Sequence, residues 1–171
     1  MRSFLLSMVM VAALACPWTL VLAEDSPAPD EPADITALMD LLGHQASEMA
    51  EFAVDFQCRL DMLLNQYNDP QGAAGMLGLM LASDNALVAA HDSILALQAL
   101  QADPDMAPEA REALMETLRN NDVRVQVAAN TRNDLDLLPV PEEYLFLRDR
   151  LKAALPRLAG TFEQLRAALD W

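Results

Sequence analysis

Two histidines and the acidic residues near them are the side chains best suited to bind a metal ion. The only two histidines in the sequence are His44 and His91. Imidazole and carboxylate groups are metal ligands, so His44 with Glu48 one helical turn later is a candidate surface site for a divalent cation. Acidic residues continue the same face at intervals of three or four, namely Asp40, Glu51 and Asp55. Because one histidine with flexible carboxylates lacks a closed ligand shell, we favour a solvated outer face over a metal site.

The second histidine falls on what we expect to be the apolar stripe of the second helix, together with Asp84. Pairing outward from a turn near residue 70 places Arg59 of the first helix within reach of Asp84, and His91 level with Met49. We favour a semi-buried Arg59–Asp84 pair that fixes helix register, with His91 at the core boundary. The alternative is that Met49 and His91 are axial ligands of haem b, an arrangement that resembles non-covalent b-type cytochrome bundles in architecture.

Several catalytic and cofactor signatures are missing from the sequence. Leu41 and Val88 stand three residues before the histidines, where a di-metal E-x-x-H motif needs Glu. Cys58 has no neighbouring histidine, and no C-x-x-C-H motif would attach haem covalently. We therefore predict that the protein is not an enzyme and has no cofactor, with haem b as the alternative.

Three glycines at intervals of three, Gly72, Gly75 and Gly78, could suggest a phosphate loop. No Lys-Ser or Lys-Thr follows them and no strand precedes them, which excludes that reading. We expect them either to let the second helix approach a neighbour closely or to loosen its first turns.

The sequence predicts four helices that position these residues, over about 34–68, 72–102, 108–138 and 141–169. In the first, apolar residues recur at helical spacing from Ile35 to Tyr67, after Asp34 as N-cap. The stripe expected to be buried in the second consists of Leu77, Met80, Leu81, Leu87, Val88, Ile94 and Leu95. In the third, the alternation of Val123, Val125 and Val127 is ambiguous, and we favour helix because no partner strand is apparent.

The fourth helix keeps four-three apolar spacing from Leu151 to Leu169, and Pro156 inside it predicts a kink. Short links force neighbouring helices to be antiparallel. The fold class is therefore all-α, with residues 34–171 forming an up-down-up-down four-helix bundle.

The segment before the bundle predicts export. Arg2, an apolar run from Phe4 and a small-residue end at Ala23 match a cleavable signal peptide over residues 1–23. A lipid on Cys16, or retention of Phe4–Ala23 as a membrane anchor, are the alternatives. Residues 24–33, acidic and rich in proline, are an expected disordered linker. We therefore expect a periplasmic or secreted protein, with any membrane tether in these first residues.

The net charge of residues 24–171 limits which classes of partner they can bind. Residues 24–171 keep all 26 acidic residues and ten of the eleven bases, a net charge of −16. Nucleic acid is an unsuitable partner, because phosphate binding needs a basic surface. An acidic surface suits a cationic partner, although such charge is more often only solubilising. After loss of the signal Cys58 is alone, which excludes a disulfide within the chain.

Two functions follow from these features. We favour a non-enzymatic exported bundle that binds another protein as an accessory, inhibitor or chaperone-like factor of the envelope. The second hypothesis is a sensory or carrier bundle that binds a small molecule or haem near His91.

Overall fold

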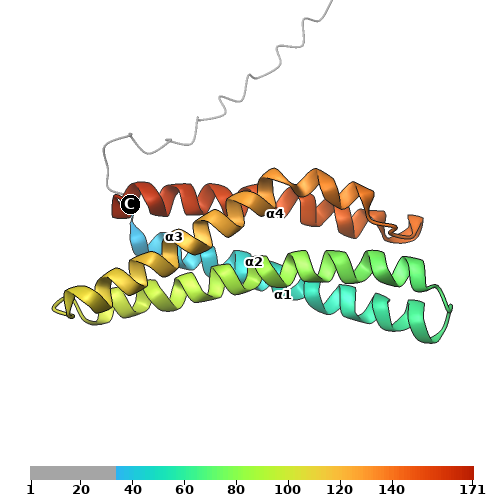
Figure 1. The fold of residues 1–171 in the computed structure, drawn as a ribbon, viewed down its shortest axis with the longest axis horizontal. Coiled ribbons are helices and arrows are strands. Elements are labelled where there is room, and N and C mark those ends of the chain that lie inside the picture. The colour runs from blue at the N-terminus through green and yellow to red at the C-terminus, as the bar shows by residue number, and fades with distance from the viewer. Residues whose placement is uncertain (1–33) are drawn as a thin grey trace, which may run out of the picture. The chain divides into compact units, whose positions relative to one another are not determined.

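The computed structural model describes residues 34–171, and the predicted signal peptide, linker and Cys16 lie outside this range. Four long helices and two short 3-10 helices make up the described chain (Figure 1). They are α1 (Ile35–Asn65), α2 (Pro70–Ala102), α3 (Pro108–Asn130), η1 (Arg132–Leu137), η2 (Glu142–Tyr144) and α4 (Leu145–Leu169).

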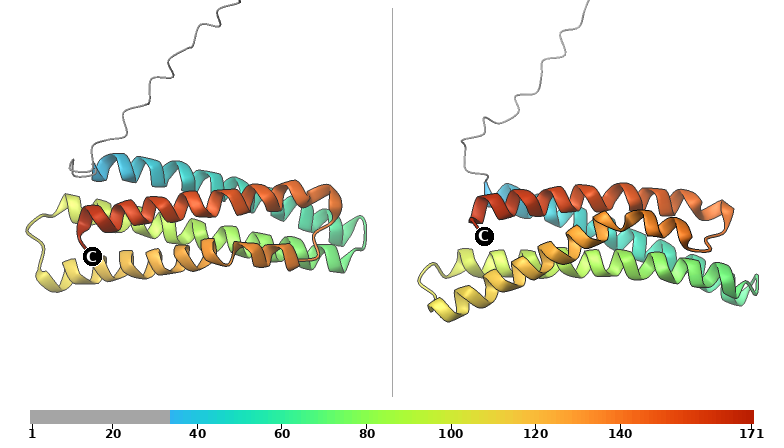
Figure 2. Two further views of the ribbon diagram at one scale, coloured as in Figure 1. Left: turned by 90° about the horizontal axis from the view of Figure 1, so that it is seen from above. Right: turned by 45° about the horizontal axis from the view of Figure 1, so that its top comes forward.

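The helices pack in chain order, and α4 also packs against α1. Two further views show the four helices side by side (Figure 2). The prediction of an all-α protein with four long helices is confirmed, and the arrangement is consistent with an up-down bundle.

The ends of the first two helices have side-chain caps. The Asp34 Oδ1 atom accepts a hydrogen bond from the backbone N–H of Thr36 at 2.9 Å, and the Asp69 carboxylate caps Gly72 in the same way at 3.0 Å. Such bonds satisfy N–H groups that the first turn leaves free. Asp34 therefore starts α1 as predicted.

Two predicted boundaries need correction. α3 ends at Asn130 rather than near residue 138, and η1 continues the chain in a tighter helical form. α4 begins at Leu145 rather than Pro141, after η2. Pro139 and Pro141 explain the late start, because each lacks an N–H and disfavours a helical conformation in the residue before it. The segment Val123–Val127 is helical, as we favoured.

The predicted buried stripe of α2 was wrong. Leu77, Leu81, Val88 and Leu95 are 41–52% exposed. The buried face consists mainly of small residues, which are Gly72, Ala73, Gly75, Ser83, Ala86, Ala89, Ala90, Ser93 and Ala96, with Met76, Leu79 and Leu97 between them. Small side chains let backbones approach closely, so this face packs against the bundle and the larger residues point outward. Met80, Leu87 and Ile94 lie at its edge, partly buried.

A close approach involving Gly75 fixes the link between η1 and α4. A Cβ atom at Gly75 would lie 2.6 Å from the carbonyl oxygen of Pro139 and 2.9 Å from the backbone nitrogen of Val140. At Gly78 the same atom would lie 2.9 Å from the side chain of Leu138. The glycine series therefore allows close packing, which was the first of the two roles predicted for it.

The core combines large apolar side chains with a polar layer between α2 and α3. The rings of Phe52 and Phe56 stack with centroids 5.9 Å apart, and both side chains are buried. Across the bundle, the buried Asn121 side chain donates to the Ser93 hydroxyl at 3.1 Å. That hydroxyl donates in turn to the carbonyl of Ala89 at 2.7 Å. This polar pair ties α3 to α2 at a fixed register.

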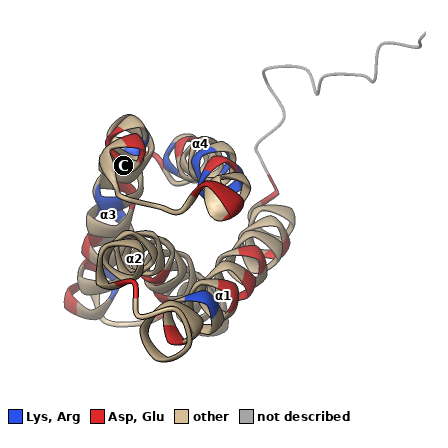
Figure 3. Ribbon diagram, turned by 90° about the vertical axis from the view of Figure 1, so that its right-hand side faces the viewer, with Lys and Arg blue, Asp and Glu red and all other residues tan. Residues whose placement is uncertain are grey.

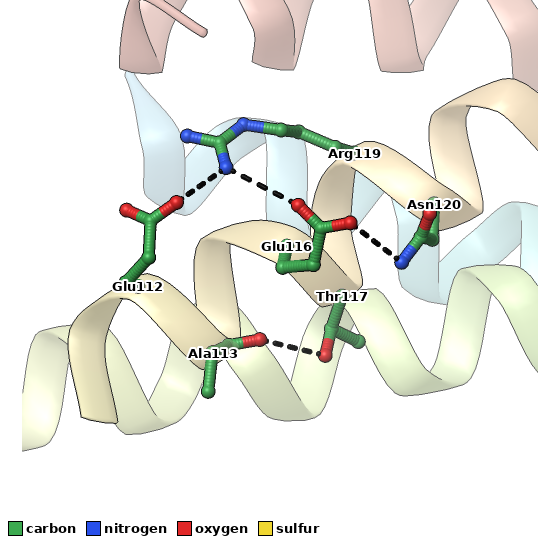
Figure 4. Close-up of polar contacts among 6 residues, drawn as sticks. All are labelled: Glu112, Ala113, Glu116, Thr117, Arg119 and Asn120. Carbon is green, nitrogen blue, oxygen red and sulfur yellow. Dashed lines mark hydrogen bonds and ion pairs between the residues drawn. The ribbon is translucent and has the colours of Figure 1, made fainter. Parts of the chain in front are cut away.

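Charge is distributed unevenly over the helices. Acidic residues follow α1, whereas Lys and Arg are concentrated on α3 and α4 (Figure 3). On α3, Arg119 bonds to the carboxylates of Glu112 at 2.7 Å and Glu116 at 3.4 Å (Figure 4). The bond to Glu112 is the main reason why the pKa of Arg119 is raised. These contacts stabilise an exposed helix surface.

Candidate functional site

The candidate cation site on α1 is not assembled. His44 is exposed, while the half-buried Glu48 carboxylate accepts two hydrogen bonds from Arg157 of α4, at 2.8 and 2.9 Å. Within residues 34–171 no group of three or more His, Cys, Asp or Glu side chains is placed to hold a metal ion. Glu48 therefore joins α1 to α4 in this structure.

The predicted Arg59–Asp84 pair does not form. The Arg59 guanidinium lies over the ring of Tyr144, 5.5 Å from its centroid, and contacts the Met62 sulfur at 3.8 Å. Asp84 is half-buried on α2, and among the described residues it takes part in no ion pair. Arg59 thus fastens the end of α1 to the segment before α4 through a cation–π contact.

Met49 and His91 lie in different environments. The Met49 side chain is completely buried. The His91 side chain is 63% exposed on α2, and its Nδ1 atom is 3.9 Å from Asp92. The expectation that His91 lies on a buried stripe was wrong for the same reason as the rest of that stripe. The structure does not bring the two proposed haem ligands together, and haem b binding stays a prediction.

A groove of about 700 Å³ lies between α2, α3 and η1, and Leu155 of α4 also lines it. Val88 and Asn85 come from α2, whereas Val123 and Val127 come from α3. The volume is within the range of known small-molecule sites. We call this hollow the α2–α3 groove.

The walls of the α2–α3 groove are mostly apolar and open to solvent. Val123 is 61% exposed, Val127 is 55% exposed and Val88 is 49% exposed. Two arginines, Arg124 and Arg132, also line it. Arg132 donates to the carbonyl of Ala129 at 2.6 Å, whereas no hydrogen bond or ion pair joins Arg124 to another described residue. The groove thus offers an apolar surface with positive charge at its edge, in a protein that is otherwise acidic.

Contacts of η1 with α4 hold one end of the groove in place. The Asp136 carboxylate pairs with Lys152 at 2.5 Å and with Arg148 at 3.3 Å. The hydrogen bond from Lys152 is the main reason why the pKa of Asp136 lies below its ordinary value. Leu135, which precedes Asp136 in the chain, lines the groove. The charged contacts therefore position an apolar wall.

Sequence reasoning missed this groove, although two signals pointed to it. α2 is apolar around its whole circumference, so it has more apolar surface than one packed face can bury. The alternation at residues 123–127 places Val123 and Val127 outward and Val125 inward on α3. Neither signal shows that α3 ends early enough for η1 to form the far wall.

One described helix, α2, is long and apolar enough to cross a membrane by length and composition alone. Core helices of globular bundles pass the same test, and α2 is packed against both α1 and α3. Cys58, on α1, is a free and exposed thiol.

Comparisons with known proteins give no assignment. No family model, no curated protein and no solved structure matches the chain. The fold defines a class, the four-helix bundle, and function has to be inferred from the surface of this molecule.

Proposed function

We propose that this protein is an exported, non-enzymatic helical bundle that binds another protein in the α2–α3 groove. It acts as an accessory, inhibitor or chaperone-like factor of the cell envelope. The observation that supports the proposal is the exposure of Val123 and Val127 along a groove of about 700 Å³. Exposed apolar residues that gather along a hollow are typical of interaction sites, whereas scattered ones need no explanation.

The shape of the groove suits a partner helix. α2 and α3 form its two long walls, and an amphipathic helix places apolar residues into such a groove at intervals of three and four. Arg124, exposed at the edge, can pair with a carboxylate on the polar side of that helix.

The acidic surface has a separate effect on the partner. With a net charge of −16 over residues 24–171, the bundle attracts a cationic protein over long distance, and this attraction weakens as salt is added. The proposed partner therefore carries net positive charge overall and presents an apolar helix with acidic residues at its edge.

The experiment is affinity capture from the envelope fraction with three forms of the protein. Val127→Glu places a charge in the groove, and Val54→Glu, on α1, is the matched control because Val54 is 64% exposed. We expect the wild type and Val54→Glu to retain one stoichiometric partner, and Val127→Glu to lose it.

Circular dichroism of each form shows whether the bundle stays folded. If no stoichiometric partner is retained, or if Val127→Glu retains it as well as the control does, the proposal is wrong.

A further inference from the structure

A second apolar surface runs along the outer side of α2. It consists of Leu77, Leu81, Val88 and Leu95, and we call it the α2 strip. All four side chains are 41–52% exposed. Their spacing of four, seven and seven residues keeps them on one side of the helix, as in the core stripe of a coiled coil. Only Val88 also lines the α2–α3 groove, so most of this surface is separate from the proposed binding site.

Two polar residues, Asp84 and His91, lie on the same side of α2 as the α2 strip. One is acidic and the other is basic. Asp84 and His91 stand one heptad apart, in the remaining core-like positions, with Val88 about midway between them. Asp84 is half-buried, the His91 side chain is 63% exposed, and no ion pair joins them within the chain. A surface of this kind has an acidic group and a basic group placed symmetrically about an apolar centre.

We propose that the α2 strip is the interface of a homodimer in which two copies of α2 pack antiparallel about a twofold axis near Val88. Twofold symmetry makes each contact occur twice, with the same surface on both subunits. An antiparallel arrangement brings Asp84 of each subunit next to His91 of the other, and Leu81 of each next to Leu95 of the other. Apolar residues meet apolar ones in either orientation, but only the antiparallel one brings the carboxylate next to the imidazole. A parallel pairing in register would place Asp84 next to Asp84 and His91 next to His91.

The choice of a second copy over an unrelated cationic protein rests on this complementarity. It also makes an opposite prediction about salt. Two subunits of net charge −16 repel each other, so added salt strengthens the homodimer, whereas it weakens binding of a cationic partner.

The test is sedimentation equilibrium of the purified protein from about 1 µM to about 1 mM, a range that covers moderate association. Cys58→Ser serves as the background, because an exposed thiol could join two copies by a disulfide. We expect dimers that strengthen with salt. Leu81→Glu and Leu95→Glu should yield monomers, whereas Val54→Glu should remain dimeric.

Exchange of the charged residues tests the antiparallel register. His91→Asp places two carboxylates together at each of two symmetric positions, and we expect about a tenfold weaker dimer. The double variant Asp84→His with His91→Asp restores complementary neighbours and should recover most of that loss. A structural role of either residue within one subunit would give no such recovery.

A wild type that stays monomeric throughout, or a dimer that persists in Leu81→Glu and Leu95→Glu with native circular dichroism, would overturn the proposal. A dimer that the double exchange weakens further would overturn the antiparallel register. None of these outcomes bears on the proposed function of the α2–α3 groove, because that proposal is tested with Val127→Glu and the capture of a different protein.

Discussion

Replacing Gly75 by alanine tests the close approach that fixes the link between η1 and α4. The new methyl group would lie 2.6 and 2.7 Å from the carbonyl oxygen and carbon of Pro139. Both are backbone atoms of a segment that contains two prolines, so the segment cannot move aside as a flexible side chain can. Overpacking of this kind costs about 1–3 kcal/mol, while alanine in place of a helical glycine contributes about 1 kcal/mol of stability.

Gly43 provides the matched control. It lies inside α1, and a Cβ atom there meets nothing within 4 Å. Gly43→Ala therefore shows the gain in helix propensity without the contact, and we expect about 0.5–1 kcal/mol of added stability. For Gly75→Ala we expect a net loss of up to about 2 kcal/mol, because the contact outweighs the same gain.

Thermal unfolding followed by circular dichroism measures both effects. About 1 kcal/mol corresponds to roughly 3–4 °C in a domain of this size, so the two variants should shift Tm in opposite directions. If Gly75→Ala melts at or above the temperature of Gly43→Ala, α2 does not pack against Pro139 and Val140 as described.

Three further predictions concern the polar layer, the η1 contacts and the export signal. Asn121→Ala should lower the free energy of unfolding by about 1–3 kcal/mol in urea titrations, whereas the exposed Asn120→Ala should change it by less than about 0.5 kcal/mol; equal effects would contradict a buried Asn121–Ser93 bond. Because the folded pKa of Asp136 lies below its unfolded value, its contribution to stability is present above the unfolded pKa and lost as pH falls through the folded pKa. The stability difference between wild type and Asp136→Asn should therefore shrink on acidification, and a difference that is constant with pH would refute the contact with Lys152. Intact mass of the exported protein should correspond to a chain beginning at Glu24, whereas a lipid on Cys16 or a retained N-terminus would show that one of the alternatives holds.

The buried faces of the first and last helices could be predicted, because large apolar residues define them. On α1 the expected stripe through Leu42, Met49 and Phe52 is buried, as is the stripe on α4 through Leu151 and Phe162. Each of these helices has one apolar face opposite a charged one, so periodicity identifies the buried side.

α2 could not be predicted in this way. Its large apolar residues and its small ones both recur at helical spacing, on different faces. Because the larger residues are more hydrophobic, their face was predicted to be the buried one. Close packing chose the small residues, with Ala90 and Ser93 fully buried and Leu81 half exposed. The wrong predictions about His91 and Asp84 have the same cause, because both residues were placed relative to the predicted buried face of α2.

The groove depends on where α3 stops. The apolar pattern continues past Asn130 through Leu135, so periodicity alone extends the helix. The change to η1 depends on the proline-rich link and on the contacts of Asp136 with α4, which involve residues distant in sequence. A site formed by such long-range contacts is not visible in the local pattern.

The most direct test of the central claim is site-specific photo-cross-linking of the protein in intact cells. A photoreactive residue at position 127 lies in the groove, and one at position 54 lies on the exposed side of α1. We predict that position 127 joins to one other envelope protein and that Val123→Glu abolishes this product, while position 54 gives no such product. Identical products from both positions, or none from position 127, would contradict the assignment of the α2–α3 groove as a protein-binding site.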